Sequence, residues 1–204
     1  MRVFVLTTGR AASKTFANAC QLLDGMSVGH ETKAGHVSDR LSFPYNHLEV
    51  DNRLVWFLGG IAERYSDDHT FYVYLTRAPK KVAESYLKRW HIKVSGVRAF
   101  YHGILMYSDK PEVATARQSC RLFVDTINEN IRYFLKGRAN WCEVRVEHLH
   151  NDFFAFMDQA GLEGDREEIA KVLGSVNNAN KTKYDKVTPL KRIANRFSDR
   201  RLNL

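Results

Sequence analysis

Cysteine, proline and long apolar runs are all scarce in this chain of 204 residues, which holds three cysteines and four prolines. The odd number and wide spacing of the cysteines exclude a disulfide-stabilised scaffold and predict reduced thiols in a core, at Cys20, Cys120 and Cys142. The scattered histidines show no zinc-ligand spacing, so we expect no metal site. No apolar run approaches the roughly 20 residues of a transmembrane helix, and residues 1–10 lack the apolar stretch of a secretory signal. These absences predict a cytoplasmic protein.

The composition that remains is that of a folded domain. Hydrophobic residues make up 44% and aromatic residues 12% of the chain, which is ordinary for a globular protein of one-domain size. No repeat, low-complexity segment or linker interrupts it, so we expect residues 1–204 to form a single domain. The formal net charge is +8, and most of it lies in the C-terminal segment 181–204. A basic surface attracts anions in general, from nucleotides to nucleic acid and sulfated glycans, without choosing among them.

Apolar strands alternate with amphipathic helices along the chain. Runs of β-branched and aromatic residues predict strands at 2–7, 26–28, 70–76 and 141–146. Apolar residues at helical spacing predict helices at 12–23, 48–65, 79–90, 112–136 and after residue 146, and an amphipathic segment at 190–202. This alternation predicts a three-layer α/β domain in which helices flank a mostly parallel central sheet. Ligands bind such sheets beyond the carboxyl ends of the strands, so we expect chemistry in the loops after residues 7, 28 and 76.

The first of these loops lies in the stretch VFVLTTGRAASKTF, residues 3–16. A helix that begins directly after a strand presents unpaired N–H groups and the positive end of its dipole, which favour an anion. A Walker A loop of the form GxxxxGKT would require glycine at two positions where this chain has Thr8 and Ser13. The strand at 70–76 leads into Arg77 rather than into an acid that could hold Mg²⁺. The loop therefore fits magnesium and ATP poorly, and a different phosphate ligand and an ordinary capped helix both stay open.

The second loop places an arginine at a strand end and a serine eight residues later in the next predicted helix. These residues are Arg77 and Ser85. Lys81 and Arg89 lie four residues before and after the serine, so these three side chains share one helical stripe. A planar guanidinium beside a hydroxyl and further cations makes a clamp for a second phosphate group. The alternative is a solvated basic face, which we favour for the individual lysines of this helix.

Both loops resemble those of the sulfotransferases that use 3′-phosphoadenosine 5′-phosphosulfate (PAPS), which have a P-loop-like fold. In that family the first loop binds the 5′-phosphosulfate with a basic residue, two small residues and then hydroxyl residues. The matching residues here are Arg10, Ala11, Ala12, Ser13, Lys14 and Thr15, with Lys14 in place of the second hydroxyl. The family's 3′-phosphate motif, an arginine at a strand end and a serine eight residues on, is matched by Arg77 and Ser85.

A third likeness lies in residues 28–33, which resemble the His-Glu segment of tyrosylprotein and bacterial sulfotransferases. In those enzymes a glutamate after the second strand acts as the catalytic base, and Glu31 takes that position here, with His30 as the competing base. Lys33 matches a nearby basic residue of the family. The sequence departs from cytosolic sulfotransferases in having no glycine-rich C-terminal segment.

The resemblance implies in-line transfer of a sulfuryl group from PAPS to an acceptor hydroxyl or amine, which leaves adenosine 3′,5′-bisphosphate (PAP). Arg10 would stabilise the charge on the departing phosphate, Glu31 or His30 would take the acceptor proton, and no metal would be required. The acceptor would be a small molecule, a carbohydrate or a peptide, selected by residues 34–60 and 91–118.

Two other functions stay open on the sequence. One is a divergent P-loop kinase, which needs an acidic magnesium ligand that we do not find. The other is a basic polyanion-binding module built on the C-terminal segment. We expect no nucleic-acid partner, and the sequence does not indicate an oligomeric state.

Overall fold

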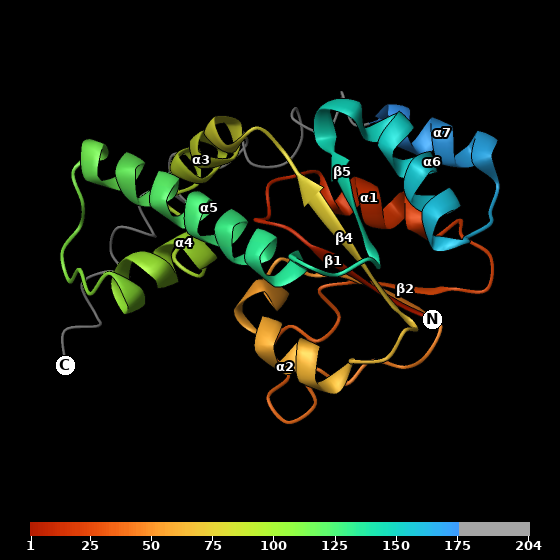
Figure 1. Ribbon diagram of the computed structural model, residues 1–204. Coiled ribbons are helices and arrows are strands. Elements are labelled where there is room, and N and C mark those ends of the chain that lie inside the picture. The colour runs from red at the N-terminus through yellow and green to blue at the C-terminus, as the bar shows by residue number, and fades with distance from the viewer. Residues whose placement is uncertain (176–204) are drawn as a thin grey trace.

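Five parallel strands form the centre of the structure, a computed structural model that describes residues 1–175 (Figure 1). The strands are β1 (Arg2–Leu6), β2 (Ser27–His30), β3 (His47–Val50), β4 (Thr70–Thr76) and β5 (Trp141–Arg145). They lie in the order β2-β3-β1-β4-β5, and every neighbouring pair is parallel. Four of them confirm the predicted strands. The segments 181–204 and 190–202 lie outside the described residues, so the single domain predicted for the whole chain stays a prediction.

β3 corrects the sequence interpretation of residues 48–65, which we predicted as one helix. The structure instead has β3, a 3-10 turn η1 (Leu54–Trp56) and the short helix α2 (Leu58–Arg64). Apolar residues at helical spacing do occur in the second half of the segment, where Leu54 and Ile61 are buried. The first half, however, alternates polar and apolar residues with the period of two that belongs to a strand.

Helices cover both faces of the sheet, which confirms the predicted three-layer α/β architecture. One face packs against α1 (Ser13–Cys20), α6 (Leu149–Ala160) and α7 (Arg166–Gly174), and the other against α2, α3 (Pro79–Lys88) and α5 (Val113–Leu135) (Figure 1). Short turns fill the connections, namely α4 (Gly96–Ala99), the π-helical η2 (Phe100–Ile104) and η3 (Val146–His148). Among residues 1–175, no helix is both long and apolar enough to cross a membrane.

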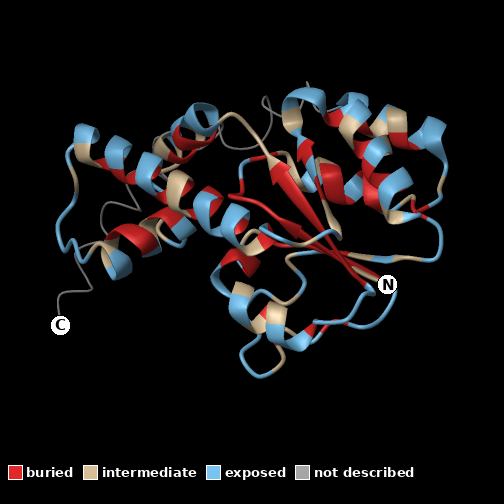
Figure 2. Ribbon diagram, in the orientation of Figure 1, coloured by how far each residue is buried: buried red, intermediate tan, exposed pale blue. Residues whose placement is uncertain are grey.

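Two apolar cores follow from the alternation of side chains along β1. Val3 and Val5 point into the core shared with α1, α6 and α7, whereas Phe4 and Leu6 point into the core shared with α2, α3 and α5. All four are fully buried, and Figure 2 shows the buried residues concentrated on the strands and on the helix surfaces that face them. With both faces covered, the carboxyl edge of the sheet is the place where loops with polar residues can form a site.

Candidate functional site

β1 and β4 lie side by side at the centre of the sheet, and the chain leaves them toward opposite sides. After β1 it leads through α1 to β2 at one edge, and after β4 it leads to β5 at the other. In open parallel sheets such a reversal creates a crevice at the carboxyl ends of the two strands, where ligands bind. The two loops singled out from the sequence follow these two strands. The topology therefore brings both of them to the crevice.

The loop after β1 turns tightly into α1. Gly9, Arg10 and Ala12 have positive φ angles of 74°, 59° and 54°. No side chain caps the N-terminus of α1, so its first-turn N–H groups can donate to an anion. In this turn Lys14 is exposed and Thr15 is half-buried. The loop thus has the backbone geometry of an anion site without the glycines of a Walker A loop.

Tyr86 of α3 fixes this loop. Its hydroxyl donates to the carbonyl oxygen of Thr8 at 2.6 Å, and burial raises the pKa of that hydroxyl to about 12, so it stays protonated. A Cβ on Gly9 would lie 2.6 Å from the Tyr86 hydroxyl oxygen and 2.7 Å from the side-chain nitrogen of Asn52. Glycine is therefore needed at position 9 both for its φ angle and for this close approach.

Three arginines from different parts of the chain lie near Ser85 and the first loop. Its Oγ accepts hydrogen bonds from Arg10 Nε at 3.3 Å and from Arg89 Nη1 at 3.0 Å. Arg77 Nη1 donates to the carbonyl oxygen of Arg10 at 3.0 Å. The eight-residue spacing of Arg77 and Ser85 thus places both beside the first loop. Lys81, on the same helical stripe, lies 3.5 Å from a carboxylate oxygen of Glu147.

The turn after β2 reaches the same place. His30 Nε2 lies 3.3 Å from Ser13 Oγ, so the end of β2 contacts the start of α1. Glu31 follows with a φ angle of 59°, and its N–H donates to the carbonyl oxygen of Val50 at 3.0 Å. The Glu31 carboxylate lies 3.1 Å from Arg53 Nη1. Both candidate bases therefore stand next to residues of the crevice.

Arg53 is a residue of the candidate site that the sequence analysis missed. It follows β3, inside the segment predicted as one helix, and its guanidinium contacts both Glu31 and Asp51. Burial lowers the pKa of Arg53, but the two carboxylates outweigh that effect, so the pKa lies above its usual value. A strand that ends near residue 50 would have pointed to Arg53, because residues that follow parallel strands border the ligand crevice.

Lys33, the other basic residue noted near Glu31, is engaged within its own loop. Its ammonium forms an ion pair with Asp39, which also accepts from His36 Nδ1 at 2.8 Å. Hydrogen bonds from Lys33 and His36 lower the pKa of Asp39 to about 2. Lys33 therefore stabilises the loop after β2.

The three cysteines are free and buried, as the sequence predicted. Burial raises the pKa of Cys120 to about 11 and that of Cys142 to about 12, so both thiols are neutral. Residues 1–175 contain no cluster of three or more histidine, cysteine or acidic side chains that could hold a metal ion.

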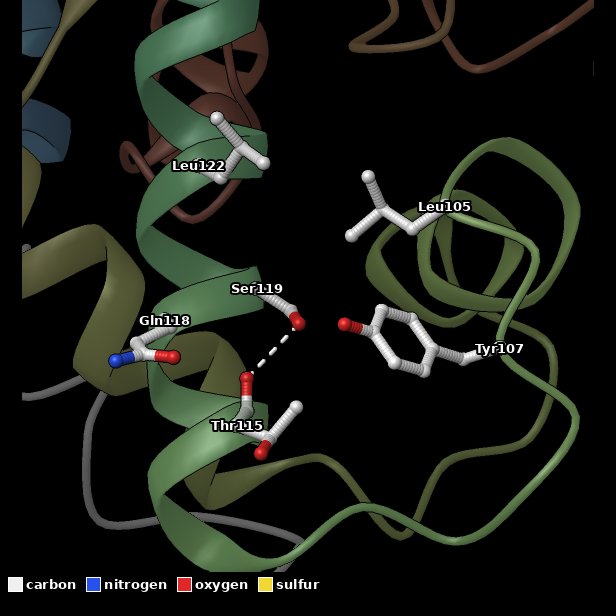
Figure 3. A pocket seen from close by; sticks show the side chains of 6 residues that line it. All are labelled: Leu105, Tyr107, Thr115, Gln118, Ser119 and Leu122. Atoms are coloured by element: carbon white, nitrogen blue, oxygen red, sulfur yellow. Dashed lines mark hydrogen bonds between the residues drawn. The ribbon is translucent and has the colours of Figure 1, made fainter.

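A cavity of about 380 Å³ opens between α5 and the segment that follows η2 (Figure 3). It is lined by Leu105, Tyr107, Thr115, Gln118, Ser119 and Leu122. Leu105 and Tyr107 extend across the cavity toward α5, and Ser119 Oγ donates to the Thr115 carbonyl oxygen at 2.8 Å (Figure 3). Most of this lining belongs to residues 91–118, one of the two regions expected to select the acceptor.

Among solved structures, the chain is similar to mouse sulfotransferase SULT7A1 complexed with PAP, with a TM-score of 0.54. The fold is sulfotransferase-like. The two chains share 11% sequence identity, and the match covers 85% of this chain. This chain spans 64% of the length of the mouse chain. No protein-family model and no curated protein sequence matches it. The likeness therefore concerns the architecture, which is the P-loop-like one that the motifs implied.

Proposed function

We propose that this chain is a sulfotransferase that takes its sulfuryl group from PAPS. The observation that carries the proposal is the meeting of three segments at the carboxyl edge of the sheet: residues 10–15, the pair Arg77 and Ser85, and the turn His30–Glu31. Hydrogen bonds of 3.0–3.3 Å link them. Each segment matches a different sulfotransferase motif, and the chain has a sulfotransferase-like fold whose mouse example is complexed with PAP.

PAPS carries phosphate groups on two sides of its ribose, and the crevice has cationic groups for both. The first turn of α1, with Arg10 and Ser13, would bind the 5′-phosphosulfate through N–H, guanidinium and hydroxyl donors. Arg77 and Ser85 would bind the 3′-phosphate, and Arg89, 3.0 Å from the serine hydroxyl, adds a guanidinium on that side. The hydrogen bond between Arg10 and Ser85 joins the two sides, so a bound donor would exchange it for bonds to its own phosphates.

The reaction would be an in-line displacement at sulfur. A bond forms between the acceptor oxygen or nitrogen and sulfur while the S–O bond to the 5′-phosphate breaks, and its electron pair leaves on PAP. Arg10 would stabilise that charge as a permanently protonated group. The acceptor proton would pass to Glu31 or to His30. The acceptor itself would be a small molecule, carbohydrate or peptide, held by residues from the regions 34–60 and 91–118.

Thermal unfolding with three ligands tests the proposal. PAP should raise the melting temperature, because a ligand that binds only the native state stabilises it, by about 2.7 kcal/mol at 100 times its Kd. Magnesium with ATP, and a single-stranded oligonucleotide, should give smaller shifts. A larger shift with magnesium and ATP would support a divergent kinase, and a salt-sensitive shift with the oligonucleotide alone would support a polyanion-binding module. Either result overturns the proposal.

Two arginine variants make this measurement specific to the site. Arg77→Ala should remove most of the shift that PAP produces, because it deletes a guanidinium on the 3′-phosphate side. Arg166→Ala is the matched control, since Arg166 forms an exposed ion pair with Asp158 and follows Gly164, which bridges Leu23 beyond the C-terminal end of α1. An equal loss of the PAP shift in both variants would mean that PAP binding depends on the net charge of the protein and not on a phosphate pocket.

A further inference from the structure

One face of β3, continued by the residue directly after it, carries ionisable side chains where the neighbouring strand carries apolar ones. His47, Glu49 and Asp51 alternate with apolar core residues and are 9%, 0% and 0% exposed. In the register of the sheet, Glu49 pairs with Phe4 of β1, which belongs to an apolar core. We call these three residues the polar stripe of β3. Burial of ionisable groups is unfavourable unless they form hydrogen bonds or ion pairs. The partners of these residues therefore show which segments the stripe fixes in place.

Glu49 holds the turn that carries Glu31. One carboxylate oxygen of Glu49 accepts from the N–H of Thr32 at 2.8 Å, and the other accepts from the Thr32 hydroxyl at 2.6 Å. The second oxygen also lies 2.9 Å from His47 Nε2. A Cβ on Gly29 would lie 2.3 Å from that oxygen, so only glycine lets the carboxylate come so close to β2.

Asp51 holds the partner of the Glu31 side chain. It accepts from Arg40 Nη2 at 2.6 Å with one oxygen, and from the N–H of Arg53 at 2.8 Å with the other. The latter oxygen also lies 3.3 Å from Arg53 Nη1, the same nitrogen that is 3.1 Å from the Glu31 carboxylate. Asp51 thereby fixes both the backbone and the guanidinium of Arg53.

We infer that the polar stripe of β3 positions Glu31 for proton transfer, with Glu49 as the main positioning residue. The inference rests on the proposed sulfotransferase function, because it assigns the stripe a role in that reaction. Glu31 has a φ of 59°, a conformation that a residue other than glycine keeps when its surroundings hold it there. The stripe holds Glu31 through two neighbours. Glu49 binds the backbone and hydroxyl of Thr32, and Asp51 binds Arg53, whose guanidinium lies beside the Glu31 carboxylate.

A pair of Thr32 variants tests the inference. Thr32 is exposed, so its replacement leaves the core intact. Thr32→Val removes the hydroxyl that Glu49 binds and should lower kcat on the order of tenfold, since small misplacements of a reacting group have large effects on rate. KM for PAPS and the shift of the melting temperature by PAP should change less than twofold. Thr32→Ser keeps the hydroxyl and should restore the wild-type kcat.

Transfer from radiolabelled PAPS is measured with phenol and with glucosamine as the acceptor probes. A Thr32→Val variant with the kcat of the wild type would overturn the inference, as would an equal loss in Thr32→Ser. If the wild-type chain transfers a sulfuryl group to neither probe, the thermal shift with PAP decides on the proposed function, and hydrogen exchange at the Thr32 amide decides on the stripe. That amide should exchange at least several-fold faster in Thr32→Val than in the wild type. Equal exchange rates would refute the anchoring role of Glu49.

Discussion

Glu31 and His30 are adjacent in the chain but face different partners. The Glu31 carboxylate lies beside the guanidinium of Arg53, and the His30 imidazole lies beside the hydroxyl of Ser13 in the first loop. The Arg53 guanidinium thus fixes the position of the Glu31 carboxylate. An imidazole in contact with Ser13 is placed to orient a group that would bind the donor. For the proposed sulfuryl transfer, these contacts favour Glu31 over His30 as the base.

Replacing each candidate base separately tests this assignment. Glu31→Gln should lower the rate of sulfuryl transfer by about 10²–10⁴-fold, the usual contribution of a positioned base. It should leave the melting-temperature shift with PAP unchanged. His30→Gln should reduce the rate less, because the amide can still bond to Ser13. Initial rates with saturating PAPS measure both. A larger loss in His30→Gln than in Glu31→Gln would reverse the two roles.

Gly9 lies where the first loop passes closest to α3. Gly9→Ala should lower the free energy of unfolding by about 1–3 kcal/mol, because it combines an unfavourable φ of 74° with a clash against Tyr86. Gly25→Ala is the control, since Gly25 has a similar φ of 68° but no atom within 4 Å of the added Cβ. Urea unfolding gives both values. If the two variants lose equal stability, the close approach to Tyr86 contributes nothing.

At the level of elements, β4 and α3 were predictable from sequence, and β3 was not. The run TFYVYLT is apolar and rich in aromatic residues, and Pro79 marks the helix start, so Arg77 and Ser85 could be placed correctly relative to each other. β3 is only four residues long, and its polar positions are buried by distant partners. Glu49 bonds Thr32 and Asp51 bonds Arg40, pairings that no local pattern indicates. The candidate bases could therefore be found in the sequence, but not the groups that hold them.

α6 and α1 depend on a cluster of aromatic rings for their packing. Phe153 is fully buried and meets Phe16 of α1 edge to face, with ring centroids 5.1 Å apart. Phe153→Ala should lower the free energy of unfolding by about 3–5 kcal/mol, the usual effect of emptying an aromatic core site. Tyr133→Ala on α5, where the side chain is 82% exposed, should change it by less than about 0.5 kcal/mol. Urea unfolding of both variants measures the difference, and similar small losses would show that the α1–α6 contact adds little stability.

For the whole molecule, the parallel sheet and its strand order decide which residues can act together. Residues near position 10, near 30 and near 80 are far apart in the chain, but each follows a strand, and all parallel strands end at the same edge. Because β1 and β4 are neighbours, the two arginines that follow them meet directly, through the bond from Arg77 to the Arg10 carbonyl. Acidic groups at the borders of this edge accept hydrogen bonds from the segments that follow the strands. Glu147, for example, accepts from the N–H of Ala78 at 3.2 Å, where α3 begins.

These carboxylates predict that the molecule loses stability in acid. For Glu49 and Glu147, burial acts to raise the pKa, but hydrogen bonds from His47 and Thr32, and from the Ala78 N–H, outweigh it and lower the pKa below the ordinary 4.5. A carboxyl group with a lowered pKa in the native state stabilises it above its ordinary pKa, and that contribution disappears as the pH falls through the native value. The free energy of unfolding should therefore be nearly constant from about pH 7 to 5 and fall below that range.

Urea unfolding from pH 7 to below pH 5 measures this free energy for the wild type and for Glu49→Gln, whose amide does not titrate. The variant should be less stable at pH 7 and lose less stability on acidification. Parallel pH profiles for the two proteins would show that Glu49 does not contribute to the acid sensitivity.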